Sequence, residues 1–333
     1  MQGQDLLSAS NALQEFERDV DCGMSSKPQK YLHPKYFYDE AGSRLFEQIC
    51  FQKEYYLTRT EAQILRDNSS EIIRLAHNGS DRINIIELGS GTSAKTRILF
   101  RYLLSEQSKQ VFYYPIDISD TALLETTNML SGDFPNLHIK EIIADYKVGL
   151  GEACALVHQD AREMNKIILF LGSSIGNLGP EEAVSFLRML RSKMLERDSL
   201  LVGFDLEKDV ETLEAAYNDK AGITAKFNLN VLGRINRELG GRFDLSLFDH
   251  FSFYNKNPHR IEMRLVSKKN QSVHVDALGK KFDFLAGETI HTENSHKYSV
   301  RRIEILVRQC GLAVKKHFMD DNRWFDLCLL APA

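Results

Sequence analysis

The segment INIIELGSGTSAKT, residues 83–96, leads an apolar stretch into two glycines and so has the form of a nucleotide-binding loop. As a Walker loop, with Asp205 as its magnesium-binding acid, it fails at Ala94, where the motif requires a glycine before the lysine. As G-x-G-x-x-A it satisfies the looser dinucleotide fingerprint. As the first loop of a methyltransferase, Gly89 and Gly91 would let the backbone lie against the amino-acid part of S-adenosylmethionine. The loop by itself leaves all three readings open.

Acidic residues end the two apolar segments that follow this loop. Asp117 ends VFYYPID and is placed to accept hydrogen bonds from both hydroxyls of a ribose, and Asp145, next to Tyr146, can accept one from an adenine amino group. In open α/β sheets, ligands bind at the carboxyl ends of the parallel strands. Nothing in this set requires a phosphate, so it favours S-adenosylmethionine over NAD or ATP.

The segments that carry these residues predict a doubly wound α/β domain. Residues 60–207 alternate between helical and strand patterns. The predicted strands are the nearly continuous apolar segments 83–88, 111–117, 138–145, 166–172 and 199–206. After them, the last part of the chain predicts a helix at 297–310 and two strands at 312–319 and 324–332. A terminal hairpin added to a parallel sheet is typical of class I, Rossmann-like methyltransferases, so we predict that fold.

Residues 208–296 have a different pattern, with long helical segments between 209 and 239 followed by alternating strands. We therefore predict two domains. The class I methyltransferase domain comprises 60–207 and 297–333. An α+β substrate-binding or cap domain comprises 1–59 and 208–296, and is inserted before the last helix and hairpin.

Composition excludes several classes of function. The chain has 333 residues, 43% of them hydrophobic and 26% charged, which is typical of a folded protein. Its net charge of −4 and its lack of a basic block argue against a nucleic-acid partner. No signal-length or membrane-length apolar run is present, so we expect a cytoplasmic protein with no membrane partner. The five cysteines and the HTENSH segment, 291–296, match no closed zinc pattern, so we expect no metal.

Six segments occur in an order that is far more specific than any glycine loop. They are KYFYDEAGSRLFEQICFQKEYYLTRTEAQIL, IIELGSGTSAKT, FLGSSIGNL, AYNDKAGITAKFNLNVLGRINRELG, RIEMRLVS and HTENSHKY. Together, from about residue 30 to the C-terminus, they resemble the L-histidine N-alpha-methyltransferase family of ergothioneine biosynthesis. The resemblance implies trimethylation of the α-amino group of L-histidine to hercynine. It also implies S-adenosylmethionine as donor, S-adenosylhomocysteine as product and no metal. The alternative is an N-methyltransferase of another amino acid, such as a tryptophan derivative.

The resemblance also implies roles for individual residues. Its cofactor contacts fall on Gly89, Lys95, Asp117, Asp145 and Tyr146. Its substrate contacts fall on Tyr38, Tyr55, Gly172, Ser174, Asn177, Tyr217, Met263, Glu293 and Ser295, and we expect Tyr38 and Asn177 to act in catalysis. We expect a monomer that binds a small molecule.

The substrate residues suit an amino-acid zwitterion and an imidazole. Tyrosine hydroxyls and an asparagine amide offer donors and acceptors without adding charge. Glu293 and Ser295 alternate on an extended segment, so both face one side and can engage the two ring nitrogens of histidine. Tyr55 and Tyr217 flank helices, where tyrosine is often a packing residue, and that alternative stays open. We assign Phe46 to the core.

Overall fold

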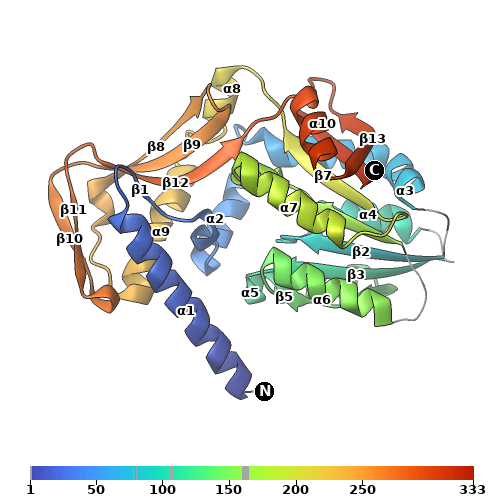
Figure 1. Cartoon of the computed structure of the whole chain (residues 1–333), viewed down its shortest axis with the longest axis horizontal. Helices are drawn as coiled ribbons and strands as arrows, with labels where there is room; N and C mark the ends of the chain where they lie inside the picture. The colour runs from blue at the N-terminus through green and yellow to red at the C-terminus, as the bar shows by residue number, and fades with distance from the viewer. Residues whose placement is uncertain (1, 78, 80, 106–108, 160–164) are drawn as a thin grey trace. The chain divides into compact units, whose positions relative to one another are not determined.

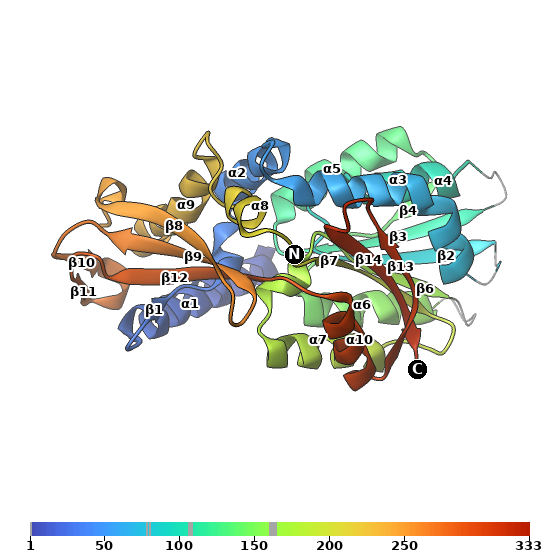
Figure 2. The ribbon, with the colours of Figure 1, turned by 90° about the horizontal axis from the view of Figure 1, so that it is seen from above.

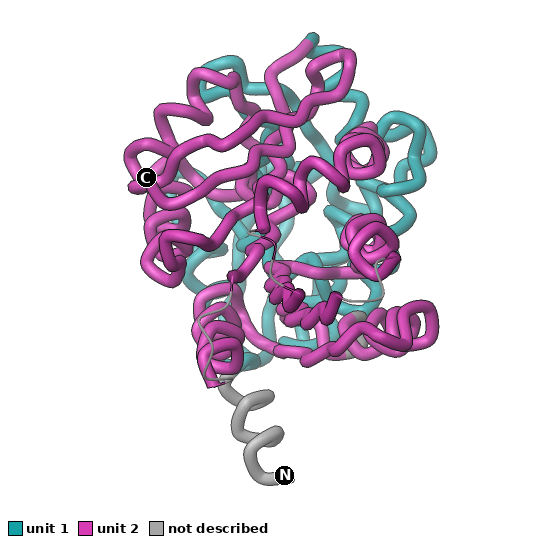
Figure 3. The backbone as a smooth tube through the Cα atoms, turned by 90° about the vertical axis from the view of Figure 1, so that its right-hand side faces the viewer, with its two compact units in different colours: residues 1–55, 209–295 teal, residues 56–208, 296–333 magenta. Residues whose placement is uncertain are grey.

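An eight-stranded sheet with helices on both faces forms unit 2, one of the two units into which contacts divide the chain. The computed structural model describes residues 2–77, 79, 81–105, 109–159 and 165–333. Unit 2 comprises Tyr56–Lys208 and His296–Ala333, and unit 1 comprises Met1–Tyr55 and Asp209–Ser295 (Figure 3, magenta and teal).

The elements of unit 2 follow one another as alternating helices and strands. In chain order they are α3 (Tyr56–Ala76), β2 (Arg82–Leu88), α4 (Thr96–Leu103), β3 (Gln110–Asp117), α5 (Asp120–Asp133), β4 (Leu137–Ile139), β5 (Ile142–Ile143), α6 (Tyr146–Gln159), β6 (Lys166–Phe170), the 3-10 turn η2 (Ser174–Asn177), α7 (Pro180–Ser192), β7 (Ser199–Asp205), α10 (Val300–Gln309), β13 (Leu312–Met319) and β14 (Phe325–Pro332).

The strand order confirms the predicted class I α/β fold. It runs β13-β14-β7-β6-β2-β3-β4, with β5 also paired with β3. Strands β2, β3, β6 and β7 pair in parallel, whereas β14 runs antiparallel to β7 and to β13. The predicted strand at 138–145 is instead two short strands, β4 and β5. Between them the amide of Lys140 still donates to the Tyr113 carbonyl at 2.9 Å, so the edge of the sheet is interrupted rather than lost.

Burial explains why these segments form the sheet. Apolar side chains of the central strands and of three helices form one core cluster, which includes Ile86, Ile168, Leu150, Leu187 and Val307. Helices α6, α7 and α10 cover this face, and α3, α4 and α5 cover the other (Figure 2). Gly311, in the left-handed region at φ 70°, ends α10 as predicted. None of the helices that the structure describes is long and apolar enough to cross a membrane.

Unit 1 combines helices with a four-stranded sheet of order β1-β12-β9-β8 and a separate β10-β11 hairpin (Figure 1). Its elements are α1 (Gln2–Ser25), β1 (Lys30–Tyr31), η1 (Pro34–Phe37), α2 (Glu40–Phe51), α8 (Val210–Ala215), α9 (Ile223–Leu239), η3 (Leu245–Leu247), β8 (Phe248–Asn255), β9 (Arg260–Ser267), β10 (Gln271–Val275), η4 (Asp276–Leu278), β11 (Lys280–Phe284) and β12 (Thr289–His296). Helix α9 packs against α2 and against β8.

The helical pattern between 209 and 239 is broken in the middle. Asp219 accepts hydrogen bonds from the amides of Ile223 and Thr224 at 2.8 and 2.7 Å and so starts α9 as a new helix. Gly222 lies in the left-handed region at φ 68°. Tyr217, one of the predicted substrate residues, therefore lies in a turn between α8 and α9 rather than within a helix.

Candidate functional site

The glycine loop is tied to the end of β3 by its backbone. The amides of Gly89 and Ser90 donate to the Ile116 carbonyl at 2.8 and 3.2 Å. Gly89 has φ 70°, and a Cβ there would lie 2.8 Å from the Tyr146 hydroxyl. A side chain at Gly89 would therefore be strained and would displace Tyr146. This explains in physical terms why the loop begins with glycine.

Asp117 and Asp145 each fix the start of the segment that follows their strand. The Asp117 carboxylate accepts from the amide of Gly91 at 2.9 Å and from that of Ser119 at 3.1 Å. One Asp145 oxygen accepts from the amides of Lys147 and Val148 at 2.8 and 3.0 Å, which caps α6. The structure thus bonds Asp117 to the glycine loop and places the Tyr146 hydroxyl beside Gly89.

Lys95 contacts a residue that sequence reasoning missed. Its ammonium lies 2.6 Å from the carboxylate of Glu61, a fully buried residue of α3. Glu61 also accepts from the Gly172 amide at 2.8 Å, so one carboxylate connects a predicted cofactor residue with a predicted substrate residue. A Cβ at Gly203 would collide with this carboxylate, so β7 carries glycine there. The available signal was a charged residue in the apolar stripe of α3, beside Leu57, Ile64 and Leu65.

The turn after β6 separates buried from accessible residues. Ser173 and Ile175 are buried, whereas Gly172, Ser174 and Asn177 are partly exposed. Ser173 has a left-handed φ of 57°, and its hydroxyl accepts from the Asp205 amide at 2.9 Å. Ser173 therefore has a structural role, and the accessible residues of the turn are those predicted to contact substrate.

A second buried carboxylate is hydrogen-bonded to residues of the glycine loop and of β3. Glu87, at the end of β2, accepts from the Thr96 hydroxyl at 2.6 Å and from the Tyr113 hydroxyl, which also bonds Ser93 at 2.8 Å. Burial raises the pKa of Glu87 to about 7, against the opposing effect of the two hydroxyl donors.

This raised pKa predicts a pH-dependent stability. Between about pH 4.5 and pH 7 folded Glu87 keeps a proton that the unfolded chain releases, so the free energy of unfolding falls as the pH rises through this window. The expected loss in the free energy of unfolding across this window is on the order of 3 kcal/mol. Glu87→Gln should flatten this part of the profile in urea unfolding from pH 4.5 to pH 8. The same slope in variant and wild type would contradict the assignment.

Unit 1 brings the predicted tyrosines into one aromatic cluster. The ring centroids of Tyr55 and Tyr217 are 6.2 Å apart, and Phe46 lies 5.6 Å from Tyr38 and 6.2 Å from Tyr55. Phe227 of α9 completes the cluster, 5.7 Å from Tyr38. The assignment of Phe46 to the core was wrong. It is partly exposed, because its place on α2 puts it between two tyrosine rings instead of within the apolar core.

The polar residues of β12 lie beside this cluster. Tyr217 donates to the Ser295 hydroxyl at 2.7 Å. Burial raises the pKa of Tyr55, and electrostatic effects of Tyr217, Cys50, Tyr38 and Glu293 raise it further. Glu293 and Ser295 are both buried. Met263 on β9 is buried as well, and its carbonyl accepts from the Thr292 hydroxyl of β12 at 3.0 Å.

Asp205 is the centre of a buried ion cluster at the end of β7. It accepts from the Tyr56 hydroxyl at 2.8 Å and pairs with Lys208 at 2.5 Å and Lys297 at 2.7 Å. Burial opposes its ionisation, but the two lysines outweigh this effect and lower the pKa of Asp205. Its carboxylate is thus committed to lysines, unlike the magnesium ligand that a Walker loop would require.

The three partners of Asp205 adjoin the places where the chain passes between units. These are Tyr55–Tyr56, Lys208–Asp209 and Ser295–His296. One carboxylate within unit 2 therefore anchors the chain next to all three connections. Sequence reasoning gave the two lysines no role, because 89 residues separate them.

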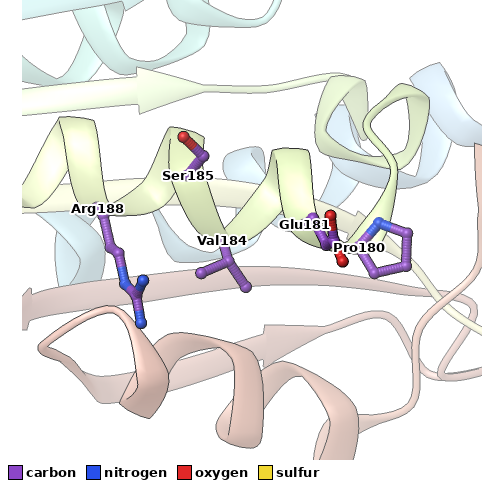
Figure 4. Close-up of a pocket in the computed structure, with 5 residues that line it drawn as sticks. All are labelled: Pro180, Glu181, Val184, Ser185 and Arg188. Atoms are coloured by element: carbon purple, nitrogen blue, oxygen red, sulfur yellow. The ribbon is translucent and has the colours of Figure 1, made fainter.

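Two further features do not involve the predicted site residues. His317, Asp326 and Cys328, on β13 and β14, are the one set of potential metal ligands found within the described ranges. His317 Nδ1 lies 2.6 Å from Asp326 across the hairpin, and this hydrogen bond raises the pKa of the imidazole, while burial raises the pKa of Asp326. A surface hollow of about 450 Å³ on α7 is lined by Pro180, Glu181, Val184, Ser185 and Arg188, none of them a predicted site residue (Figure 4).

Comparison with known proteins finds relatives along nearly the whole chain. A family model described as "Histidine-specific methyltransferase, SAM-dependent" matches residues 16–332. A histidine N-alpha-methyltransferase of Mycolicibacterium smegmatis is 41% identical over 97% of this chain and 97% of its own length. Ergothioneine biosynthesis protein 1 of Schizosaccharomyces pombe is 31% identical over 66% of the chain and 28% of its own. The L-tryptophan methyltransferase trpM of Psilocybe serbica is 26% identical over 88% and 86%.

Proposed function

Because the chain belongs to the family of histidine-specific methyltransferases that depend on S-adenosylmethionine, we propose that it trimethylates the α-amino group of L-histidine. The product is hercynine, and the reaction is the first step of ergothioneine biosynthesis. The observation that carries the proposal is the high identity to a histidine N-alpha-methyltransferase along almost the whole of both chains.

The residues of unit 2 fit the cofactor. Asp117 holds a carboxylate at the glycine loop, where it can accept from both ribose hydroxyls, and the left-handed Gly89 keeps the backbone open beside Tyr146. S-adenosylmethionine supplies an electrophilic methyl group on a sulfonium. Lys95, held by Glu61, and Asp145 complete the cofactor contacts that we propose.

The residues of unit 1 fit the substrate. Glu293 and Ser295 are proposed to bind the two imidazole nitrogens, with Met263 as a wall of the pocket. Tyr38, Tyr55 and Tyr217 are proposed to bind the amino-acid group. In support of this assignment, Tyr55, Tyr217, Glu293 and Ser295 are buried in unit 1, and the Tyr217 hydroxyl donates to Ser295. Gly172, Ser174 and Asn177 of unit 2 are proposed as the remaining contacts.

Methyl transfer is an in-line displacement, so the chain must present a neutral amine lone pair to the methyl carbon. Tyr38 and Asn177 are proposed to orient the amine, and the Tyr38 hydroxyl offers a route by which the ammonium group loses one proton to water before each of the three transfers. Aromatic rings such as Tyr38, Phe46 and Tyr55 can stabilise the growing alkylammonium by about 1–2 kcal/mol. A sulfonium needs no Lewis acid to release its methyl group, so turnover should persist in a chelator.

A time course with purified protein tests the function. Histidine and excess S-adenosylmethionine should give mono-, di- and trimethylhistidine in succession by mass spectrometry, and both intermediates should themselves be substrates. The methylated amines should react because tyrosine hydroxyls can be bypassed as methyl groups replace protons. A reaction that stops at one methyl group would contradict trimethylation, and preferential turnover of tryptophan in an amino-acid panel would favour the alternative substrate.

Asp117→Ala tests the cofactor assignment separately. We expect the dissociation constant of S-adenosylmethionine to rise on the order of 10²-fold, since charge-assisted hydrogen bonds contribute about 1.5–3 kcal/mol each. Histidine affinity should change far less. Calorimetry measures both constants, and Glu152→Ala, which removes an exposed carboxylate of α6, is the matched control. Unchanged cofactor affinity in folded Asp117→Ala would remove the ribose assignment.

A further inference from the structure

Tyr217 forms hydrogen bonds through both its side-chain hydroxyl and its backbone carbonyl. Its hydroxyl donates to Ser295 at 2.7 Å, and its carbonyl, in the turn after α8, accepts from the Nε2 of His250 at 2.9 Å. The Ser252 hydroxyl makes a longer contact of 3.4 Å with the same carbonyl. Because Tyr217 lies outside a regular helix, these contacts from β8, together with its amide bond to the Glu214 carbonyl at 3.1 Å, fix the backbone position from which its side chain extends.

A chain of hydrogen bonds fixes which nitrogen of His250 carries the proton. Asn228 of α9 is fully buried, and its side-chain nitrogen lies 3.0 Å from the Arg264 carbonyl and 2.9 Å from His250 Nδ1. A carbonyl can only accept, so the amide must turn its NH₂ toward Arg264. The second amide hydrogen then points at Nδ1, which must accept it. The proton of the neutral imidazole is thus on Nε2, where it donates to Tyr217.

We propose that His250 is a positioning residue that sets the substrate affinity of this enzyme, by holding Tyr217 where its hydroxyl meets Ser295. The proposal rests on the proposed function, because it takes Tyr217 and Ser295 as histidine contacts. Every link of the chain requires a neutral ring, since protonation would turn an Nδ1–H toward the Asn228 amide. Burial lowers the pKa of His250, although the Tyr217 carbonyl and Asp219 oppose the shift, so the ring stays neutral near pH 7.

Two substitutions separate this role from simple packing. His250→Leu fills a similar volume with an apolar side chain but removes the hydrogen-bond donor. In His250→Gln, the side-chain amide nitrogen can take the place of Nε2. We expect His250→Leu to raise KM for histidine about tenfold, the equivalent of one hydrogen bond, with the dissociation constant of S-adenosylmethionine unchanged. His250→Gln should restore most of the loss. Loss of affinity for both ligands without rescue by Gln would mean a packing role and overturn the proposal.

A third measurement does not depend on turnover. The ¹⁵N shifts of the imidazole, assigned by their loss in His250→Gln, should show the Nε2–H tautomer at pH 7, and an Nδ1–H tautomer would overturn the proposal. Wild-type protein that fails to methylate histidine would contradict the proposed function instead. Wild type that methylates histidine, combined with an unchanged KM in His250→Leu, would contradict only the positioning role.

Discussion

Glu293→Ala should lower kcat/KM for histidine on the order of 10²-fold, while turnover of phenylalanine or tryptophan changes little or rises. The loss combines a charge-assisted hydrogen bond to the imidazole with misplacement of the amine that must face the methyl group. Sites built to hydrogen-bond their substrate reject analogues that lack the partner by about 10⁴-fold or more. Removing the buried carboxylate removes the group that such an analogue would leave unpaired.

The measurement is kcat/KM for each amino acid at saturating cofactor, with folding checked independently. Asn294→Ala is the matched control, since it removes a polar side chain from the same strand. The Asn294 side chain bonds His291 at 2.9 Å. Successive strand residues face opposite sides, so this change should leave histidine turnover nearly intact. Full histidine selectivity in Glu293→Ala would place the imidazole site elsewhere.

Asp205→Ala should reduce the free energy of unfolding by about 3–5 kcal/mol, because it leaves two buried lysines without their carboxylate. Lys208 and Lys297 are almost completely inaccessible to water. Burial already lowers the pKa of Lys208 to about 8, although Asp205 opposes the shift, so the charged form of Lys208 depends on this carboxylate. The cost arises from uncompensated buried charge rather than from the net strength of the ion pairs.

Urea unfolding can follow this cluster directly. The only tryptophan of the chain, Trp324, has its ring 5.2 Å from that of Tyr56, so its fluorescence reports on the surroundings of Asp205. Glu196→Ala is the control. It removes an exposed partner of Arg191 and should cost less than about 1 kcal/mol. Equal losses in the two variants would show that the buried cluster has no special role in stability.

Much of the fold could be predicted because burial requires a simple pattern of apolar residues along the sequence. Strands covered on both faces require continuous apolar runs, and the segments that became β2, β3, β6 and β7 contain them. The edge strand at 138–145 and the helical region at 209–239 were predicted less well. In both places a local backbone or side-chain contact decides where the element stops, and no periodicity records it.

The sequence by itself determined the class of protein, because the glycine loop, the acidic strand ends and six ordered motifs are local features. Only the tertiary structure decided which polar residues meet. Glu61 reaches Lys95 and Gly172 from α3, and Phe46 enters the tyrosine cluster from α2. His250 bonds a carbonyl 33 residues away. Such contacts depend on how helices pack on sheets, and a buried polar residue is stable only where packing supplies its partner.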